Sequence, residues 1–209
     1  MLRMSSPARH APQRLILGSS SPYRRELLQR LRLPFACHSP SIDESPLPGE
    51  APSDTARRLA LAKARAVAVQ QPGAVVIGSD QVAELDGQAL GKPGSHERAV
   101  AQLRAMSGRQ LQFHTAVAVL DAQGQCVGEA LSTVRVRLRV LSEAEIEHYL
   151  RAEQPYDCAG SAKVEGLGIT LLEAVESDDP TALIGLPLIA TTTLLRRAGF
   201  ALPGTGTNA

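Results

Sequence analysis

The sequence predicts an α/β protein in which a mixed sheet and its flanking helices form two lobes around a cleft. Short apolar runs alternate with helical patterns along the chain, as strands joined by helices do. One later segment alternates valine with arginine, which is typical of a half-buried strand. The 209 residues are enough for one sizeable domain, and neither internal repeats nor a sharp linker divides them.

In the first half of the chain, serine residues mark the expected helix starts. Ser21 is the expected N-cap and Pro22 the first helical residue, because these residue types are favoured at those positions. Ser53 and Ser95 are expected to cap two further helices. A hairpin turn is predicted at Asp86-Gly87. The expected strands cover 14–18, 35–38, 74–78 and 82–85, and the expected helices cover 22–31, 54–71 and 95 to about 107.

In the second half, a predicted strand over 129–140 has a core-facing and a basic side. We interpret its arginines as a solvated edge or the rim of a dimer rather than a nucleic-acid surface. A capping box at Ser142-x-x-Glu145 predicts a helix to about residue 151. Further strands are expected at 113–120 and 168–172, and a last helix at 187–199. The alternating residues are Val134, Val136, Leu138 and Val140 on one side and Arg135, Arg137 and Arg139 on the other.

The composition excludes several classes of protein. A net charge of +1 gives no bulk field that would recruit nucleic acid or an acidic membrane. Cys37, Cys126 and Cys158 lie far apart without metal-type spacing, so we expect reduced thiols with packing roles. The first residues lack the apolar core of a signal peptide, and no run is long enough to span a bilayer. We therefore expect a soluble, cytoplasmic protein with flexible tails at 1–13 and 203–209.

The segment 15–28 carries the strongest functional signal. Arg24 and Arg25 fall in the first turn of the helix expected after Ser21, at the positive end of the helix dipole, where cations are disfavoured. A bound anion would resolve this conflict, because N–H groups, hydroxyls and guanidiniums would converge on it. The alternative is that both arginines are solvated and cover a core edge with their stems. We favour the anion site.

Carboxylates and sparse lysines extend this hypothesis. Asp80 is expected just past the carboxyl end of a central strand, where ligands of open α/β sheets bind, although an aspartate there can also simply start a turn. The chain has only three lysines, Lys63, Lys92 and Lys163, and lysine suits sites that need a compact charge. A site of carboxylates and phosphates fits Mg²⁺ or Mn²⁺ better than a His or Cys metal site would. This set of residues is suited to metal-assisted hydrolysis of a phosphoanhydride.

The sequence resembles the Maf family of nucleotide pyrophosphatases over about residues 14–200. The motifs that carry the resemblance are SPYRRELL from Ser21, Ile42-Asp43-Glu44, Lys63-Ala64, Gly78-Ser79-Asp80-Gln81, Gly91-Lys92-Pro93, Met106-Ser107-Gly108, Gly160-Ser161-x-Lys163-x-Glu165-Gly166 and Gly185-Leu186-Pro187-Leu188. The resemblance implies one catalytic domain with the fold of the inosine triphosphate pyrophosphatases, in which a central mixed sheet adjoins a deep cleft. It also implies cleavage between the α and β phosphates of a nucleoside triphosphate with a divalent metal.

Roles for individual residues follow from the resemblance. Asp80 corresponds to the family's proton acceptor and, with Glu44, to its metal site. Asp179 is a weaker correspondence. The residues that the resemblance assigns to substrate binding are Ser19, Arg24, Arg25, Lys63, Lys92 and Lys163.

Three positions distinguish branches within the family, and here they hold Tyr23, Gln81 and Glu165. They resemble the branch that hydrolyses 7-methyl-GTP to 7-methyl-GMP and diphosphate, although that branch often has tryptophan in place of Tyr23. N7-methylation makes guanine cationic, so a carboxylate at Glu165 would attract it and the ring of Tyr23 would stack on it. Packing at the helix start is the alternative role for Tyr23.

Two other functions stay open at this point. One is the same reaction on dTTP, UTP or another noncanonical nucleotide. The other is a nucleotide-binding regulator of cell division with little hydrolysis, which the origin of the family's name in a division phenotype motivates. The expected partner is a small nucleotide, with no nucleic acid and no membrane, and the chain is a candidate homodimer because members of the family commonly are.

Overall fold

The computed structural model describes residues 13–203. The tails predicted at 1–13 and 203–209 therefore lie outside the described residues, apart from Gln13 and Pro203. Gln13 is held to the body of the protein, because its Nε2 donates a hydrogen bond to the carbonyl oxygen of Ala198 at 3.1 Å. In this described part, no helix combines the length and the apolar composition needed to cross a membrane.

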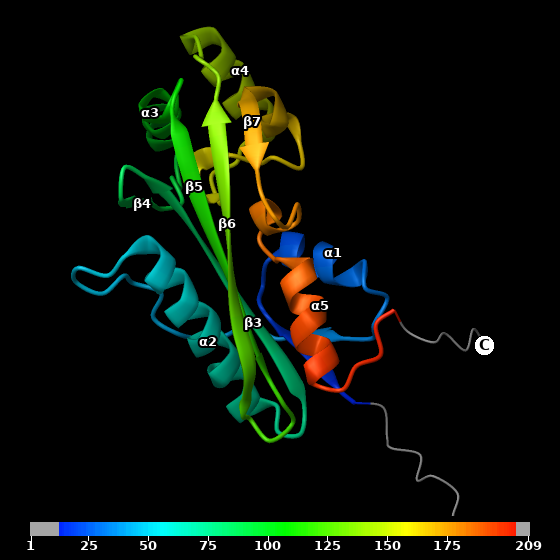
Figure 1. The fold of residues 1–209 in the computed structure, drawn as a ribbon. Coiled ribbons are helices and arrows are strands. Elements are labelled where there is room, and N and C mark those ends of the chain that lie inside the picture. Colours follow the sequence, from blue (N-terminus) through cyan, green and yellow to red (C-terminus); the bar gives the residue numbers. More distant parts are fainter. Residues whose placement is uncertain (1–12, 204–209) are drawn as a thin grey trace, which may run out of the picture.

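The predicted mixed sheet is present, with helices packed on both of its faces (Figure 1). Its strand order is β2-β1-β3-β5-β6-β7, and β4 pairs with β3 outside this path. β1 pairs in parallel with β2 and β3, whereas the other pairs are antiparallel. The strands are β1 Leu15–Gly18, β2 Ala36–Cys37, β3 Val75–Leu85, β4 Gln88–Leu90, β5 Gln110–Leu120, β6 Cys126–Leu138 and β7 Leu172–Glu176.

The helices pack through their apolar side chains in two groups, one at each end of the long strands (Figure 1). At one end, α2 packs on one face of the sheet, and α1 and α5 pack on the other. At the opposite end, α3 and α4 share a third apolar cluster with β5 and β6. The helices are α1 Pro22–Gln29, α2 Pro52–Gln70, α3 His96–Met106, α4 Glu143–Glu153 and α5 Leu188–Arg197, with short 3-10 helices η1 Ala159–Ser161, η2 Leu167–Leu171 and η3 Ala182–Ile184.

Local capping chemistry explains most of the boundaries. Ser21 caps α1 by accepting a hydrogen bond from the backbone of Arg24, and Ser95 caps α3 in the same way. The capping box at Ser142 is complete. Asp86 and Gly87 both have positive φ angles, 51° and 78°, as a two-residue hairpin turn requires. These four predictions are confirmed.

Three local predictions are wrong. Ser53 does not cap α2, because the helix already begins at Pro52 and its N-cap is Ala51. The segment 168–172 is mostly 3-10 helix, and β7 begins only at Leu172, where pairing with β6 becomes possible. Val140 is 85% exposed. β6 ends at Leu138, so the alternation of buried and exposed side chains that the sheet imposes stops before Val140.

The arginines of β6 do not form an edge. β6 lies between β5 and β7, and two of its arginines are matched by acidic residues at the outer strand. Arg137 pairs with Glu173 at 3.0 Å and Arg135 approaches Glu176 at 4.0 Å. The topology corrects the interpretation as an edge: these arginines are exposed, but they lie on an inner strand and are paired with acidic residues of β7.

Gly78 sets the distance between the central strand and α2. A Cβ atom at this position would overlap the carbonyl oxygen of Ala60 and would lie 2.6 Å from the backbone nitrogen and 2.8 Å from the Cβ of Ala64. Only glycine lets helix backbone and strand backbone approach this closely. The close approach brings Lys63, which lies between Ala60 and Ala64 on α2, directly against β3.

Candidate active site

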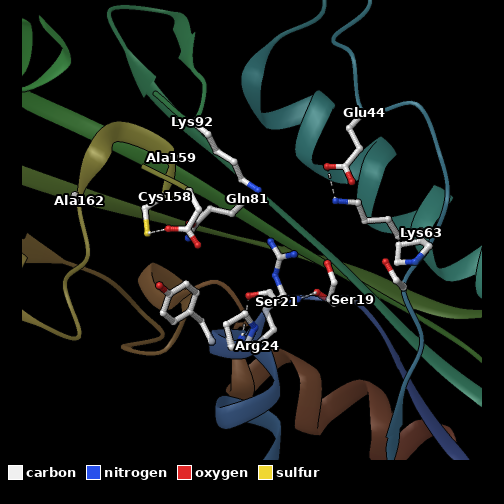
Figure 2. A pocket seen from close by; sticks show the side chains of 16 residues that line it. Ser19, Ser21, Arg24, Glu44, Lys63, Gln81, Lys92, Cys158, Ala159 and Ala162 are labelled. Carbon is white, nitrogen blue, oxygen red and sulfur yellow. Dashed lines mark hydrogen bonds and ion pairs between the residues drawn. The ribbon is translucent and has the colours of Figure 1, made fainter. Parts of the chain in front are cut away.

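A cavity lies where the middle of β3 lacks a neighbouring strand on one side. β1 pairs with residues 75–78 of β3 and β4 pairs with residues 83–85, so residues 79–82 have no strand partner on that side. A cavity of about 300 Å³ adjoins this stretch. A volume near this value is at the low end of small-molecule sites. The side chains that line it and carry polar atoms are Ser19, Ser20, Ser21, Tyr23, Arg24, Ser39, Glu44, Lys63, Gln81, Lys92, Asp157 and Cys158 (Figure 2).

Asp80 is a buried carboxylate on the α2 side of β3. Its place differs from the prediction, because it lies in the middle of the 11-residue strand rather than past its end. It does lie beyond the carboxyl end of β1, whose pairing with β3 stops at Gly78. Burial raises the pKa of Asp80, and the positive charges of Lys63 and Arg24 lower it in part.

Lys63 reaches inward from α2 and joins two carboxylates. Its Nζ donates to Asp80 Oδ1 at 2.6 Å and to Glu44 Oε2 at 2.8 Å, and only 5% of the residue is exposed. The prediction left open whether this lysine points inward or outward. An ammonium buried to this extent requires paired acceptors, so the geometry settles the direction.

The loop that carries Glu44 is tied to α2 by a second ion pair. Arg58 donates through Nε and Nη2 to the two oxygens of Glu50, at 2.6 and 2.7 Å, and also to the carbonyl oxygen of Ser45 at 3.1 Å. The bidentate contact with Arg58 lowers the pKa of Glu50 to about 2. Glu44 itself remains largely exposed, so its carboxylate faces Lys63 on one side and solvent on the other.

Arg24 enters the cavity from the first turn of α1. Its Nε donates to the carbonyl oxygen of Gly185 at 2.8 Å, and Ser79 Oγ donates to the same oxygen at 3.0 Å. Among residues 13–203, no group accepts a hydrogen bond from the two Nη groups, so they are available to a ligand. Burial lowers the pKa of Arg24, while Asp80 and Glu44 raise it. Burial of the guanidinium is therefore what opposes its charge in this structure, and two nearby carboxylates partly offset that effect.

Tyr23 and Cys158 form a wall of the cavity at its other end. Burial, followed by the negative charges around it, raises the pKa of the Tyr23 hydroxyl, so the ring stays neutral. Burial also raises the pKa of Cys158 to about 12, which favours the protonated thiol over the nucleophilic thiolate. Sequence reasoning treated all three cysteines as packing residues, but Cys37 and Cys126 are exposed and Cys158 lines the cavity. No sequence signal marked Cys158.

Gln81 faces the cavity from the side of β3 opposite to Asp80. Asp80 contacts Lys63 on α2, whereas Gln81 Nε2 donates to the carbonyl oxygens of Ala182 and Leu183 on η3 at 2.9 and 3.0 Å. Successive side chains of a strand alternate between faces. Gln81 lines the cavity directly, whereas the face that carries Asp80 borders it through Lys63 and Glu44, because Asp80 itself is buried and is not a lining residue.

Five predicted residues do not line the cavity: the buried Asp80, and Arg25, Lys163, Glu165 and Asp179. Arg25 is exposed and lines a neighbouring hollow with Ser19, Ser20 and Ser21, and Lys163 is paired with Glu153 at 3.0 Å. Glu165 is exposed beside the cavity, and its charge contributes to the raised pKa values of Tyr23 and Cys158. Asp179 is a buried structural residue, because its carboxylate accepts from the backbone of Ile189 at 2.7 Å at the start of α5.

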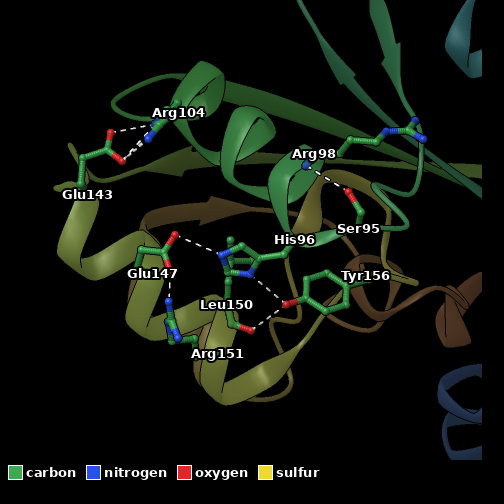
Figure 3. Close-up of polar contacts among 9 residues, drawn as sticks. All are labelled: Ser95, His96, Arg98, Arg104, Glu143, Glu147, Leu150, Arg151 and Tyr156. Carbon is green, nitrogen blue, oxygen red and sulfur yellow. Dashed lines mark hydrogen bonds and ion pairs between the residues drawn. The ribbon is translucent and has the colours of Figure 1, made fainter.

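A polar network holds together the two loops at the far side of the cavity (Figure 3). His96 lies 3.0 Å from the hydroxyl of Tyr156 and 3.0 Å from Glu147. The backbone nitrogen of Gly94 donates to the carbonyl oxygen of Tyr156 at 3.0 Å. The network thereby joins the loop of Lys92 to the loop of Cys158, and both of these residues line the cavity.

The carboxylates of the site fit a divalent cation in part. Glu44 and Asp80 both reach the single Nζ of Lys63, so their oxygens lie around one point of positive charge. Among the described residues, no group of three or more His, Cys, Asp or Glu side chains could hold a metal. Two carboxylates completed by phosphate oxygens and water are an ordinary Mg²⁺ arrangement, so a metal would depend on the substrate.

We predict that the carboxyl group of Asp80 titrates above the usual aspartate range in the metal-free protein. Since the folded-state pKa is raised, ionisation of Asp80 costs stability as pH rises through that value. Lys63→Met should raise the pKa further, because the ammonium favours the carboxylate. NMR titration of the Asp80 side-chain carbon would measure both values. Arg65→Met, on the exposed side of the same helix, is the control, and an unchanged pKa in Lys63→Met would contradict the prediction.

Taken together, the fold and the cavity define an α/β protein with a site for a phosphorylated ligand, built from buried cations beside two carboxylates. A family model described as Maf-like protein matches residues 14–198. The chain belongs to this family.

Curated relatives match nearly the whole chain. A 7-methyl-GTP pyrophosphatase of Polaromonas sp. (strain JS666 / ATCC BAA-500) is 65% identical over 188 residues, which are 90% of this chain and 86% of that protein. Another of the same name, from Albidiferax ferrireducens, is 60% identical over 96% of this chain and 100% of that protein. A solved dITP/XTP pyrophosphatase of Mycobacterium abscessus is 19% identical over 60% of this chain and 73% of that chain, with a TM-score of 0.39, a likeness too weak to argue from.

Proposed function

We propose that this protein is a cytoplasmic nucleoside triphosphate pyrophosphatase that hydrolyses 7-methyl-GTP to 7-methyl-GMP and diphosphate. The observation that carries the reaction type is Asp80, a buried carboxylate held by Lys63 within reach of the Arg24 guanidinium. Relatives named 7-methyl-GTP pyrophosphatase, 59–65% identical to this chain, support the substrate.

The cations of the cavity would bind the triphosphate. Arg24 offers two free Nη groups, and Lys92 extends into the cavity from an exposed loop (Figure 2). Lys63 would exchange part of its contact with Glu44 for a phosphate oxygen. Charged donors fixed in a partly desolvated cavity stabilise the charge that develops on a phosphoanhydride as it breaks.

Asp80 would orient and deprotonate the water that attacks the α-phosphate. Its raised pKa makes it a stronger base than an exposed aspartate, while the positive charges of Lys63 and Arg24 favour its ionised form. A proton acceptor held in place by a neighbouring hydrogen bond is the usual geometry of general base catalysis. Glu44 and Asp80 would hold Mg²⁺ or Mn²⁺ together with the phosphates, and the ion would neutralise phosphate charge.

Base selection would take place at the opposite end of the cavity. Tyr23 supplies an aromatic face there, and Glu165 supplies negative charge at the rim. A methylated guanine carries a positive charge that ordinary guanine lacks, so both contacts favour it. Lys163 would not contact the base directly, because its ammonium is paired with Glu153.

A panel of nucleoside triphosphates assayed for diphosphate release, with Mg²⁺ and with Mn²⁺, tests the proposal. We expect the highest kcat/KM on 7-methyl-GTP. A higher value on dTTP or UTP would reject the substrate but retain the reaction. Tight binding of 7-methyl-GTP without diphosphate release would instead identify a nucleotide-binding regulator. Sedimentation of the same sample would test whether the chain is a homodimer.

We predict that Glu165→Gln lowers the preference for 7-methyl-GTP over GTP. The substitution removes the rim charge that attracts the methylated base, while it leaves the phosphate contacts intact. The ratio of the two kcat/KM values should fall by about two- to fivefold, the value of one ion-pair contact at an exposed site. Glu173→Gln, an exposed residue paired with Arg137 on the far strand, should keep the ratio. A preserved ratio in Glu165→Gln would remove Glu165 from base selection.

A further inference from the structure

The amide of Gln81 is held in one orientation by three acceptors. Its Nε2 lies 2.9 Å from the carbonyl oxygen of Ala182, 3.0 Å from that of Leu183 and 2.9 Å from Thr115 Oγ1. Backbone carbonyl oxygens accept hydrogen bonds but cannot donate them. The NH₂ end of the amide must therefore face η3, and the carbonyl end Oε1 must face the other way.

The Oε1 atom of Gln81 is open to the cavity. Within residues 13–203, no group donates a hydrogen bond to Oε1. The same part of the chain contains no buried side-chain nitrogen or oxygen without a hydrogen-bond partner. Oε1 is therefore accessible, and Gln81 lines the cavity near Lys92 and Cys158 (Figure 2). A glutamine normally offers a ligand both a donor and an acceptor. Here the protein uses the donor end, and only an acceptor remains.

Thr115 is the residue that completes this orientation. It is fully buried and stands directly beside Gln81 on the neighbouring strand β5. Its Oγ1 donates to the carbonyl oxygen of Ala182 at 2.9 Å and accepts from Gln81 Nε2. The hydroxyl thereby links the strand pair to η3 and adds a third acceptor for the Gln81 NH₂ group beside the two carbonyl oxygens of η3.

We infer that Thr115 is a positioning residue that fixes Gln81 as a hydrogen-bond acceptor, so that the base edge recognised by Gln81 is an N–H donor. The inference rests on the proposed function for the identity of the ligand. Guanine offers such donors at its ring imino and exocyclic amino groups. A base that presents only a ring nitrogen lone pair at this point would meet a second acceptor and be rejected.

Steady-state kinetics of three variants test the inference. Thr115→Val should raise KM for 7-methyl-GTP by about tenfold, since one neutral hydrogen bond is worth about that factor, and should leave kcat within about twofold. Thr115→Ser keeps the hydroxyl and should restore KM. In a Gln81→Ala background, Thr115→Val should raise KM no further, because a positioning residue acts only through the residue it positions. An equal rise of KM in that background would overturn the inference.

A ligand-free measurement separates this inference from the proposed function. In the unliganded protein, the side-chain NH₂ protons of Gln81 should exchange slowly with solvent, and Thr115→Val should speed that exchange while Thr115→Ser does not. Fast exchange in the unaltered protein would overturn the inference whatever the substrate is. If another nucleotide proves to be the substrate, the KM comparison is made with that nucleotide, and the Gln81 dependence is expected to persist. Thermal unfolding of each variant verifies that it is folded.

Discussion

Asp80→Asn is expected to lower kcat/KM by about a thousandfold or more while the protein stays folded. The substitution removes a proton acceptor, which alone contributes about 10²–10⁴-fold, together with a candidate metal ligand. The asparagine retains the shape of the side chain and an oxygen that can accept from Lys63 Nζ. Since burial opposes ionisation of Asp80, the neutral variant should unfold at an unchanged or higher Tm. Diphosphate release and a thermal melt measure the two effects.

Asp86→Asn is the matched control for this experiment. Asp86 lies in the exposed hairpin turn after the same strand and does not line the cavity. Its φ angle is 51°, and asparagine tolerates this conformation well. Its activity should equal that of the unaltered protein. A turnover within a few fold of normal in Asp80→Asn would remove Asp80 from the reaction and leave the cavity a binding site.

Gly78→Ala is expected to be the most damaging small substitution for stability. The added methyl group would overlap the carbonyl oxygen of Ala60 and crowd the backbone of Ala64, and neither can move without the whole of α2. Overpacking of this kind costs about 3 kcal/mol or more, which lowers Tm by about 6–12 °C for a chain of this size. Because Lys63 lies on the displaced helix, kcat/KM should fall as well.

Gly91→Ala provides the comparison in stability. A Cβ there would meet nothing within 4 Å, and the residue does not need a positive φ. Its Tm should be unchanged within about a degree, and a chemical denaturation series would confirm the difference in unfolding free energy between the two variants. Equal melting temperatures for Gly78→Ala and Gly91→Ala would show that α2 can move away from β3 at little cost.

Much of the fold was predictable because its signals are local. The caps at Ser21, Ser95 and Ser142 depend on neighbouring residues alone, as does the turn at Asp86. The errors fall where distant partners decide. The start of β7 depends on pairing with β6, and the exposure of Val140 depends on where that pairing ends. Periodicity within one segment carries no information about either.

The site was predictable in its residue types more than in its geometry. Asp80, Lys63, Arg24 and Glu44 come together, as their charges led us to expect. Arg25 lines a neighbouring hollow rather than the cavity itself, and its direction depends on the rotation of α1, which residue spacing does not define. Lys163 is withdrawn by a partner ten residues earlier, Glu153 at the end of α4, and an ion pair between a loop and a helix end leaves no signature in the sequence motif of Lys163.

The alternation of Asp80 and Gln81 has a consequence for how such a scaffold can diversify. The two residues are adjacent in the chain but contact different elements, α2 and η3. If the proposed roles hold, substitutions around Gln81 should change the choice of base without disturbing α2, the helix that holds the proposed proton acceptor. One dipeptide at a break in a sheet thus allows the chemistry to be inherited unchanged while the choice of nucleotide evolves.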